Sequence, residues 1–289
     1  MRLLPIAGLQ TAPVPWDVSA TAARFADHVR AVRDSFPQTR LVLAPELHLM
    51  AIGHPLDEHP GYAKEVAVDL DGPLCRDLAE LARQTRTWLV PGSVFEQGEG
   101  GAVHNTALVF SPDGELVTRY RKCFPWQPYE RSVPGRELVT FDIPGVGRLG
   151  LAICHDGAFP EVFRQLAWFG AEAVLQPVLT PTTDRPQEIV LARANAIANQ
   201  MYVVSLNAAA PTGVGRSVVV DPEGHVRHEA GATDEVVTDV LDLDVTTRVR
   251  THGTAGLNRL LDQLDRVGPS IDLPAYGGYR ARPRGAAAE

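Results

Sequence analysis

The chain has 289 residues, of which 45% are hydrophobic and 21% charged, and its formal net charge is −8. This composition is typical of a globular enzyme, and the acidic balance argues against nucleic acid or an anionic membrane surface as a partner. The cysteines Cys75, Cys123 and Cys154 lie far apart and do not resemble a disulfide framework, so we expect a reducing, cytoplasmic location. We expect neither a membrane span nor a signal peptide, because the apolar runs are too short.

Strands and helices alternate along the chain. A strand over 3–9 is followed by a helix that begins at Ser19 or Thr21 and ends at Arg33. Further strands are predicted over 41–45, 88–95, 105–110, 116–121, 150–153, 173–176, 202–207, 217–220, 226–229 and 236–241, and further helices over 71–85, 161–169 and 187–199. The turn sequences Ser-Pro-Asp-Gly and Asp-Pro-Glu-Gly predict two hairpins. This order predicts a mixed α/β sandwich in one domain over 1–267, with an irregular tail over 268–289.

The most informative segment covers residues 149–161. A short apolar strand ends at Cys154, a turn of sequence Cys-His-Asp-Gly follows, and an amphipathic helix begins at Glu161. At a strand-to-helix turn the backbone N–H groups point outward, and the helix N-terminus favours negative charge. This environment lowers the pKa of a thiol and can hold a developing oxyanion. A buried structural cysteine is the competing interpretation.

Two further polar clusters follow strand ends. Glu46 comes directly after the apolar strand 41–45, and ligands collect at the carboxyl ends of strands in open α/β sheets. Lys122 follows the strand 116–121 and opens a loop rich in aromatic residues and proline that can bring Glu130 near it. The aromatic side chains need burial, which predicts a partly desolvated lysine. A solvated glutamate and an exposed loop are the alternative interpretations.

The order Glu46, Lys122, Cys154, each at the end of a strand, resembles the Glu-Lys-Cys triad of the nitrilase superfamily of carbon–nitrogen hydrolases. The resemblance extends over about residues 2–249 and includes both hairpins and the helix–strand segment 192–207. It implies a four-layer α-β-β-α sandwich, in which two mixed sheets pack face to face.

Within that superfamily, two motifs resemble the aliphatic amidases and formamidases. They are Arg-Lys-x-x-Pro-Trp-x-Pro-x-Glu, which ends at Glu130, and Cys-His-Asp-Gly, which begins at Cys154. Ala158 stands where N-carbamoyl amino acid amidohydrolases and ω-amidases usually carry an arginine that binds a substrate carboxylate, which implies a neutral or cationic amide. Leu47 and the pair 131–132 depart from the amidase pattern, where tyrosine and Gly-Trp are usual. Because of these departures, the motifs do not define which residues form the acyl pocket.

The resemblance implies covalent catalysis on a small primary carboxamide. Cys154 would attack the carbonyl to form a thioester, and Glu46 would act as general base and then general acid. Lys122 and the backbone N–H of His155 would stabilise the oxyanion. Glu130 would position the amide nitrogen or support Lys122.

Trp126 and Val178 are expected in the substrate pocket, and no metal or organic cofactor is required. Acyl transfer to another acceptor shares the thioester and remains an alternative, as do N-carbamoyl hydrolysis and a binding module without catalysis. The sequence Gly-x-Gly-x-x-Gly over 145–150 matches a dinucleotide motif but precedes a strand. The histidines within 48–59 offer a metal site, but a loop at the pocket entrance fits their spacing better.

We also expect a homodimer or a larger homo-oligomer, because members of the superfamily commonly stack two sandwiches. The predicted helix 161–169 carries more apolar surface than one buried stripe uses, in the residues Val162, Phe163, Leu166, Trp168 and Phe169. Part of this surface would face a partner, and the tail could lie across the neighbouring subunit.

Overall fold

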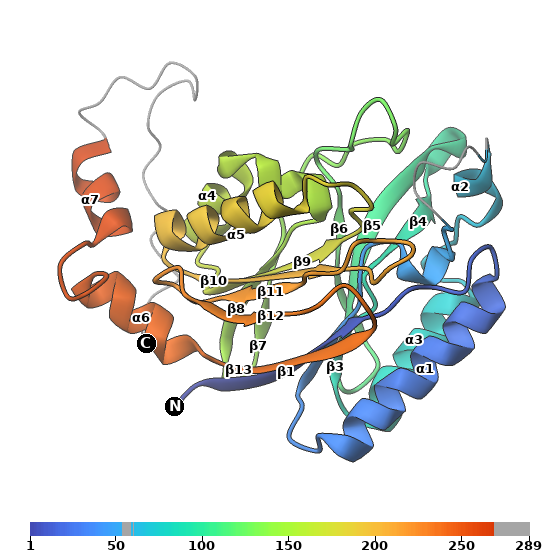
Figure 1. The fold of residues 1–289 in the computed structure, drawn as a ribbon, viewed down its shortest axis with the longest axis horizontal. Coiled ribbons are helices and arrows are strands. Elements are labelled where there is room, and N and C mark those ends of the chain that lie inside the picture. The colour runs from blue at the N-terminus through green and yellow to red at the C-terminus, as the bar shows by residue number, and fades with distance from the viewer. Residues whose placement is uncertain (54–58, 60, 269–289) are drawn as a thin grey trace.

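Two β-sheets pack face to face, and helices cover the outer face of each sheet (Figure 1). The computed structural model describes residues 1–53, 59 and 61–268. The inner faces of the sheets enclose a core to which one sheet contributes Leu4 and Leu41 and the other Leu149 and Leu175. The predicted α-β-β-α sandwich of two mixed sheets is confirmed.

The first sheet has the strand order β13-β1-β2-β3-β5-β4, with β6 paired to β5. β2 runs parallel to β1 and β3, whereas β13 and β1 are antiparallel. Helices α1 and α3 cover its outer face, where Phe25 and Leu78 pack against Leu89 and Leu108. The elements are β1 (Leu3–Gln10), α1 (Val18–Ser35), β2 (Leu41–Leu43), η1 (His48–Met50), α2 (Tyr62–Glu65), α3 (Pro73–Thr85), β3 (Trp88–Val90), β4 (Ser93–Gln97), η2 (Glu99–Gly101), β5 (Val103–Phe110), β6 (Leu116–Arg121) and β13 (Glu235–Asp242).

The second sheet has the strand order β12-β11-β10-β9-β8-β7, and β9 runs parallel to β8 and β10. Helices α4 and α5 cover its outer face, where Phe163 and Ala196 pack against Val174 and Val203. Its elements are β7 (Thr140–Ile143), β8 (Gly147–Leu151), η3 (Cys154–Ala158), α4 (Pro160–Trp168), β9 (Ala173–Val178), α5 (Arg185–Asn199), β10 (Tyr202–Asn207), β11 (Val218–Val220) and β12 (Val226–Glu229). Helices α6 (Leu243–His252) and α7 (Leu260–Val267) follow β13.

The predicted strand 88–95 is two strands, because the chain turns sharply at Gly92. This glycine has a φ of +81°, and a Cβ on it would lie 1.7 Å from the carbonyl oxygen of Pro45. Only glycine fits both constraints. The break lets the chain segment that leads to Glu46 pass directly over the junction of β3 and β4, where the Leu47 N–H donates to Ser93 Oγ at 3.1 Å.

Three further local predictions need correction. The N-cap of α1 is Asp17, whose side chain accepts a hydrogen bond from the Ala20 N–H at 2.8 Å, rather than Ser19 or Thr21. The motif over 145–150 spans the turn of a hairpin that joins β7 to β8, and Gly147 begins β8. The sequence did not predict β7, α6 or α7.

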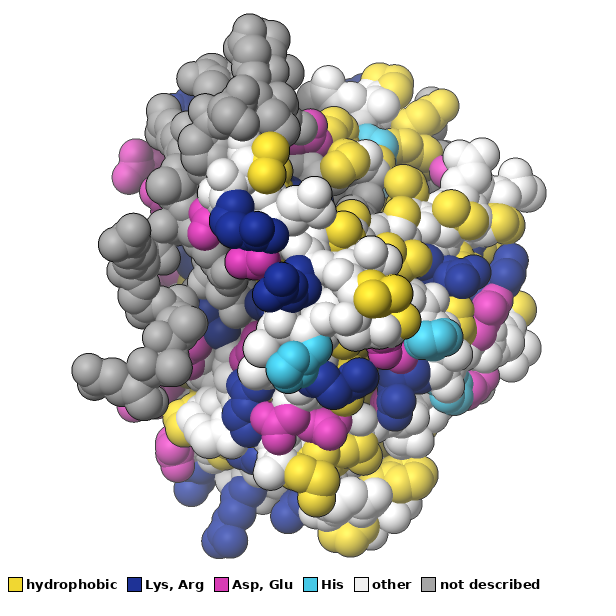
Figure 2. All heavy atoms as spheres, turned by 90° about the vertical axis from the view of Figure 1, so that its left-hand side faces the viewer, with side chains coloured by type: hydrophobic (Ala, Val, Ile, Leu, Met, Phe, Trp, Pro, Cys, Tyr) yellow, Lys and Arg dark blue, Asp and Glu magenta, His cyan; other side chains and the backbone are white. Residues whose placement is uncertain are grey.

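The face where α6 and α7 lie carries basic and acidic side chains interspersed (Figure 2). Mixed signs over one face do not create the extended positive field that a nucleic acid requires. Within the described ranges, no helix is both long enough and apolar enough to cross a membrane. The predicted tail lies outside the described residues, apart from Gly268.

Candidate active site

The charged side chains of Glu46, Lys122 and Glu130 form one largely buried cluster. The Lys122 ammonium lies between two carboxylates, with Nζ 2.8 Å from Glu46 Oε1 and 2.6 Å from Glu130 Oε2. The side chains of Lys122 and Glu46 are only 2% and 4% exposed. Burial alone would lower the pKa of Lys122, but the two carboxylates together raise it well above its usual value. The lysine is therefore a fixed positive charge in a nearly dry site.

The two carboxylates differ in their surroundings. Glu130 also accepts hydrogen bonds from the Ser132 hydroxyl at 2.6 Å and the Trp126 N–H at 3.0 Å. Although burial acts to raise the pKa of Glu130, the ammonium and these donors lower it overall, whereas burial raises the pKa of Glu46 in spite of the ammonium. Asn105 Nδ2 lies 2.8 Å from Glu46 and 2.9 Å from Glu130. Glu46 is therefore the carboxylate that takes up a proton more readily.

A buried carboxylate fixes the turn that carries the cysteine. Cys154 has a φ of 44°, a left-handed conformation that is uncommon for residues other than glycine. Asp156 Oδ2 accepts from the Ile153 N–H and the Tyr120 hydroxyl, both at 2.8 Å. Its Oδ1 accepts from the Phe124 N–H at 2.9 Å. Because Tyr120 and Phe124 flank the lysine in sequence, Asp156 ties the cysteine turn to the lysine segment.

The thiol of Cys154 lies within the electrostatic field of the charged cluster. Burial raises the pKa of the thiol well above its usual value and Glu46 raises it further, while Lys122 and the backbone N–H of Leu179 act in the opposite direction. The interaction with Cys154 acts in turn to lower the pKa of Glu46. The resting thiol is therefore neutral and interacts with the carboxylate that takes up a proton most readily.

A cavity of about 30 Å³ opens beside Cys154. The residues that line it are Trp126, Cys154, His155, Leu179, Thr180, Pro181, Thr182, Asp184 and Glu188. Trp126 and His155 are thus at the wall, whereas Val178 does not line this cavity. Strand β9 continues to Val178, whose side chain is buried in the fold and whose carbonyl oxygen accepts from the Glu46 N–H at 3.3 Å. The two residues after Val178 reach the cavity instead.

The sequence interpretation did not identify Thr180, Asp184 or Glu188. Thr180 follows the end of β9, and the other two lie at the start of α5, which begins at Arg185 and not at residue 187. The rule that pointed to Glu46, that ligands collect at the carboxyl ends of strands, applies equally to Thr180. Asn105 begins a predicted strand, and its place between the carboxylates appears only in the fold.

The histidines considered as a metal site do not converge. His48 is buried, its ring lies 6.0 Å from that of Phe25, and burial lowers its pKa to about 3. His59 stacks on Trp16 at 5.3 Å, and His54 is outside the described residues. In the part of the chain that the structure describes, no three potential ligands gather at one point.

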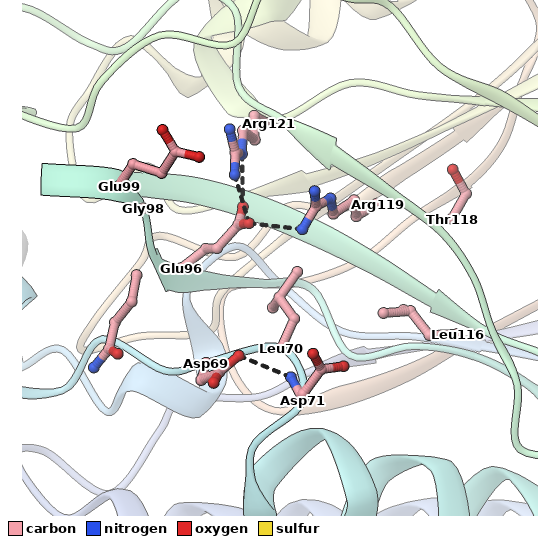
Figure 3. Close-up of a pocket in the computed structure, with 11 residues that line it drawn as sticks. Asp69, Leu70, Asp71, Glu96, Gly98, Glu99, Leu116, Thr118, Arg119 and Arg121 are labelled. Carbon is pink, nitrogen blue, oxygen red and sulfur yellow. Dashed lines mark hydrogen bonds and ion pairs between the residues drawn. The ribbon is translucent and has the colours of Figure 1, made fainter. Parts of the chain in front are cut away.

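A larger hollow of about 390 Å³ lies away from Cys154, at β4 and β6 (Figure 3). At its centre the buried Glu96 accepts from Arg119 at 2.9 Å and from Arg121 at 2.7 and 2.8 Å. Thr106 donates a further hydrogen bond at 2.7 Å. Both oxygens of Glu96 are used in these contacts. The cluster therefore stabilises the pairing of β4 with β5 and of β5 with β6.

Residues 5–251, which span nearly all of the sandwich, match the model of the carbon-nitrogen hydrolase family, and the chain belongs to that family. A formamidase of Bacillus cereus (strain B4264) is 30% identical over 220 residues, and the match covers 73% of this chain. A formamidase of Bacillus anthracis matches at the same identity and length. The match covers 65% of the length of each of these curated relatives.

Two solved structures extend the comparison. A member of branch 10 of the nitrilase superfamily from Saccharomyces cerevisiae has a TM-score of 0.78 and 28% identity, over 86% of this chain and 94% of that chain. A mutant of the amidase from Nesterenkonia sp. AN1, showing covalent addition of the acetamide moiety of fluoroacetamide at the active site cysteine, has a TM-score of 0.75 and 25% identity, over 85% and 92% of the two chains. The expected class, the carbon–nitrogen hydrolases of the nitrilase superfamily, is confirmed, and the similar proteins include formamidases and an amidase.

Proposed function

We propose that this protein hydrolyses a small neutral or cationic primary carboxamide to a carboxylic acid and ammonia, with Cys154 as the nucleophile. The observation that carries the proposal is the hydrogen-bonded cluster of Glu46, Lys122 and Glu130 beside a cysteine that lies on a strained turn and lines a cavity. The formamidase and amidase relatives support the same reaction.

The first half of the reaction forms a thioester. Glu46 takes the thiol proton while the sulfur of Cys154 attacks the amide carbon, and the carbonyl electrons move to oxygen. Lys122 and the backbone N–H of His155 stabilise this oxyanion, and one such donor contributes about 3 kcal/mol. When the oxyanion collapses, the C–N bond breaks and Glu46 returns its proton to the nitrogen, which leaves as ammonia. Glu130 holds Lys122 in place throughout.

The second half of the reaction releases the acid. Glu46, again ionised, takes a proton from a water molecule that attacks the thioester carbon. The new tetrahedral oxyanion faces the same donors, and its collapse returns the proton to the sulfur of Cys154. Atoms and charges balance without any further group, so the described residues are sufficient for the whole cycle.

The shape and charge of the cavity support the proposed substrate class. A cavity of about 30 Å³ favours a small substrate. The wall contains the carboxylates of Asp184 and Glu188, and its described lining residues include no lysine or arginine. An amide that also carries a carboxylate would therefore meet like charges.

Removal of the nucleophile tests the proposal. Cys154→Ala should abolish ammonia release from formamide, acetamide and propionamide while leaving the circular dichroism spectrum unchanged. Cys75→Ala, at a buried cysteine on α3, is the matched control and should keep its turnover. Full activity in the Cys154→Ala variant would exclude the mechanism.

Two further measurements distinguish the alternatives. Added hydroxylamine reports acyl transfer, because a transferase would form the hydroxamate in place of the acid. A panel that includes N-carbamoyl amino acids and ω-amides tests the substrate class. A preference for an N-carbamoyl amino acid would contradict the proposed charge selectivity.

A further inference from the structure

One wall of the cavity carries the hydroxyl of Thr180, whose only proton is already used in a hydrogen bond. Thr180 Oγ1 donates to Glu188, with Oε1 at 2.8 Å and Oε2 at 2.9 Å. A hydroxyl has a single proton to donate. Toward the cavity, where it lies 3.9 Å from the sulfur of Cys154, Oγ1 therefore offers only lone pairs.

The backbone of Thr180 is held in place by Asn207. The Thr180 N–H donates to Asn207 Oδ1 at 2.8 Å, and Asn207 Nδ2 donates back to the Thr180 carbonyl at 3.2 Å. Asn207 is fully buried at the end of β10. This double contact preorganises the threonine before any substrate arrives.

A buried arginine holds the carboxylate of Glu188. Arg185 is 1% exposed and its Nη1 donates to Glu188 at 2.9 Å. Its other N–H groups donate to the hydroxyl and carbonyl oxygens of Ser205 and to the carbonyl of Arg216. A guanidinium has about five N–H donors, and these contacts use all of them. Arg185 thus fixes Glu188 and has no donor left for a ligand in the cavity.

We propose that Thr180 and Glu188 select amides that carry an N–H donor on the acyl side of the carbonyl, such as an α-ammonium group. This inference rests on the proposed amidase function and specifies its acyl group. The carboxylate of Asp184 lines the same cavity, as do Leu179 and Pro181. The small size of the cavity favours a short acyl group.

The same wall disfavours the two obvious competitors. A methyl group in place of the donor would cover the lone pairs of Thr180 and the carboxylate of Glu188 without replacing their hydrogen bonds to water. Sites built to bind a polar group reject the apolar analogue for this reason. A carboxylate there would meet Glu188 and Asp184 and find no free donor from Arg185.

Glycinamide and propionamide test the inference, because they have the same number of heavy atoms and differ in a terminal ammonium or methyl group. At neutral pH the kcat/KM of the wild-type protein for glycinamide should exceed that for propionamide by about 10- to 100-fold, mainly through KM. Thr180→Val keeps the shape of the side chain and removes its oxygen, so it should abolish most of this preference. Glu188→Gln should reduce it as well.

Thr182→Val is the matched control. Thr182 lines the same cavity, but its hydroxyl donates to Asp184 and not to Glu188, so the variant should keep the preference for glycinamide. A structural defect caused by threonine replacement would change the rates for both amides alike, whereas the proposed role changes their ratio.

Binding to the Cys154→Ala variant separates this inference from the proposed function. Ligand-observed NMR titration should show tighter binding of glycinamide than of propionamide. If neither amide is hydrolysed by the wild-type protein while this difference persists, the amidase proposal fails and the selectivity stands. If propionamide is turned over at least as well as glycinamide, or if Thr180→Val keeps the preference, the inference is overturned and the amidase function remains.

Discussion

In this site, a single positive charge forms ion pairs with two carboxylates. Lys122 bonds to both Glu46 and Glu130, so the buried cluster keeps a net negative charge when both are ionised. That charge opposes formation of a thiolate at Cys154, in agreement with the raised pKa of its buried thiol. The thiol loses its proton only when a neighbour accepts it. At the scale of residues, the proposed attack by the sulfur is therefore coupled to proton uptake by Glu46.

The decrease of kcat/KM at low pH should reflect the protonation of Glu46. Its carboxylate must be ionised to act as a base, and burial raises its pKa above the ordinary value of about 4.3. As the pH falls, kcat/KM for a substrate that does not titrate should therefore decline at a higher pH than an ordinary glutamate would give. Circular dichroism over the same pH range must show an intact fold. An acid limb at or below the ordinary value would contradict this role.

The sequence was informative about residues that follow a strand directly. Glu46 and Lys122 each come within three residues of the end of a strand, so their position at one edge of the fold could be predicted. Glu188 and Asn105 could not be assigned in this way. Glu188 reaches Thr180 only because of how α5 is oriented against β9, and Asn105 meets the carboxylates only because β5 pairs with β6. Those contacts depend on tertiary packing, which no local pattern encodes.

At the scale of elements, the segment that joins β8 to α4 is organised around Asp156. Its carboxylate is fully buried and accepts from Ile153, Tyr120 and Phe124, which belong to two separate parts of the chain. Burial raises the pKa of Asp156 to about 6, so the carboxylate is mainly ionised at neutral pH. The turn thus depends on one side chain for both its shape and its attachment to the lysine segment.

Asp156→Ala should destabilise the protein and reduce its activity. The substitution leaves three buried donors without an acceptor, and each unsatisfied donor costs about 1–3 kcal/mol. We therefore expect the free energy of unfolding to fall by about 3 kcal/mol or more in denaturant titration, together with a lower kcat as the cysteine turn loosens. Asp77→Ala, at an exposed position on α3, is the control and should change stability by less than about 1 kcal/mol. Equal stability of the two variants would show that Asp156 does not hold the turn.

Element prediction succeeded where a clear turn sequence marked the element. The hairpin of β5 and β6 was predicted from the turn sequence Ser-Pro-Asp-Gly, and it is confirmed. Helix α6 was missed because its buried face consists of only Leu243, Thr246 and Val249 among polar residues. The strand over 88–95 was predicted as one element, because the close approach of Gly92 to Pro45 is a contact between distant segments.

At the scale of the whole molecule, residues at the N-terminus contact both sheets and the start of the C-terminal helices. β1 pairs with β13 along its full length. Arg2 donates to Asp244 at the start of α6 and to Glu172 just before β9, both at 2.8 Å. One side chain thus connects the first sheet, the second sheet and the C-terminal helices. These contacts favour a single domain over 1–267, which stays a prediction.

The outer layer formed by α4 and α5 is the surface on which we expect a second copy to pack. Of the five apolar residues on the predicted helix, Val162, Phe163 and Leu166 are buried within the subunit, and Trp168 and Phe169 are half-buried. Because the first three pack internally, α4 alone offers less apolar surface to a partner than its sequence predicts. Helix α5, which lies beside α4 in Figure 1, adds the apolar side chains of Val190 and Ile197, which are 64% and 41% exposed. Exposed apolar side chains on one layer favour association.

Sedimentation at low micromolar concentration should therefore show a dimer or a larger species. Val190→Glu would place a charge in the interface, where it would be desolvated without a partner, and should shift the protein toward the monomer. Val117→Glu, at a residue of β6 that is 41% exposed, is the matched control and should leave the assembly unchanged. A wild-type monomer would refute the expected assembly, while a dimer that tolerates Val190→Glu but is lost in Val117→Glu would move the interface to the hairpin of β5 and β6.

Truncation after Val267 tests separately whether the tail contributes, since a tail that crosses the neighbouring subunit would leave a weaker dimer when removed.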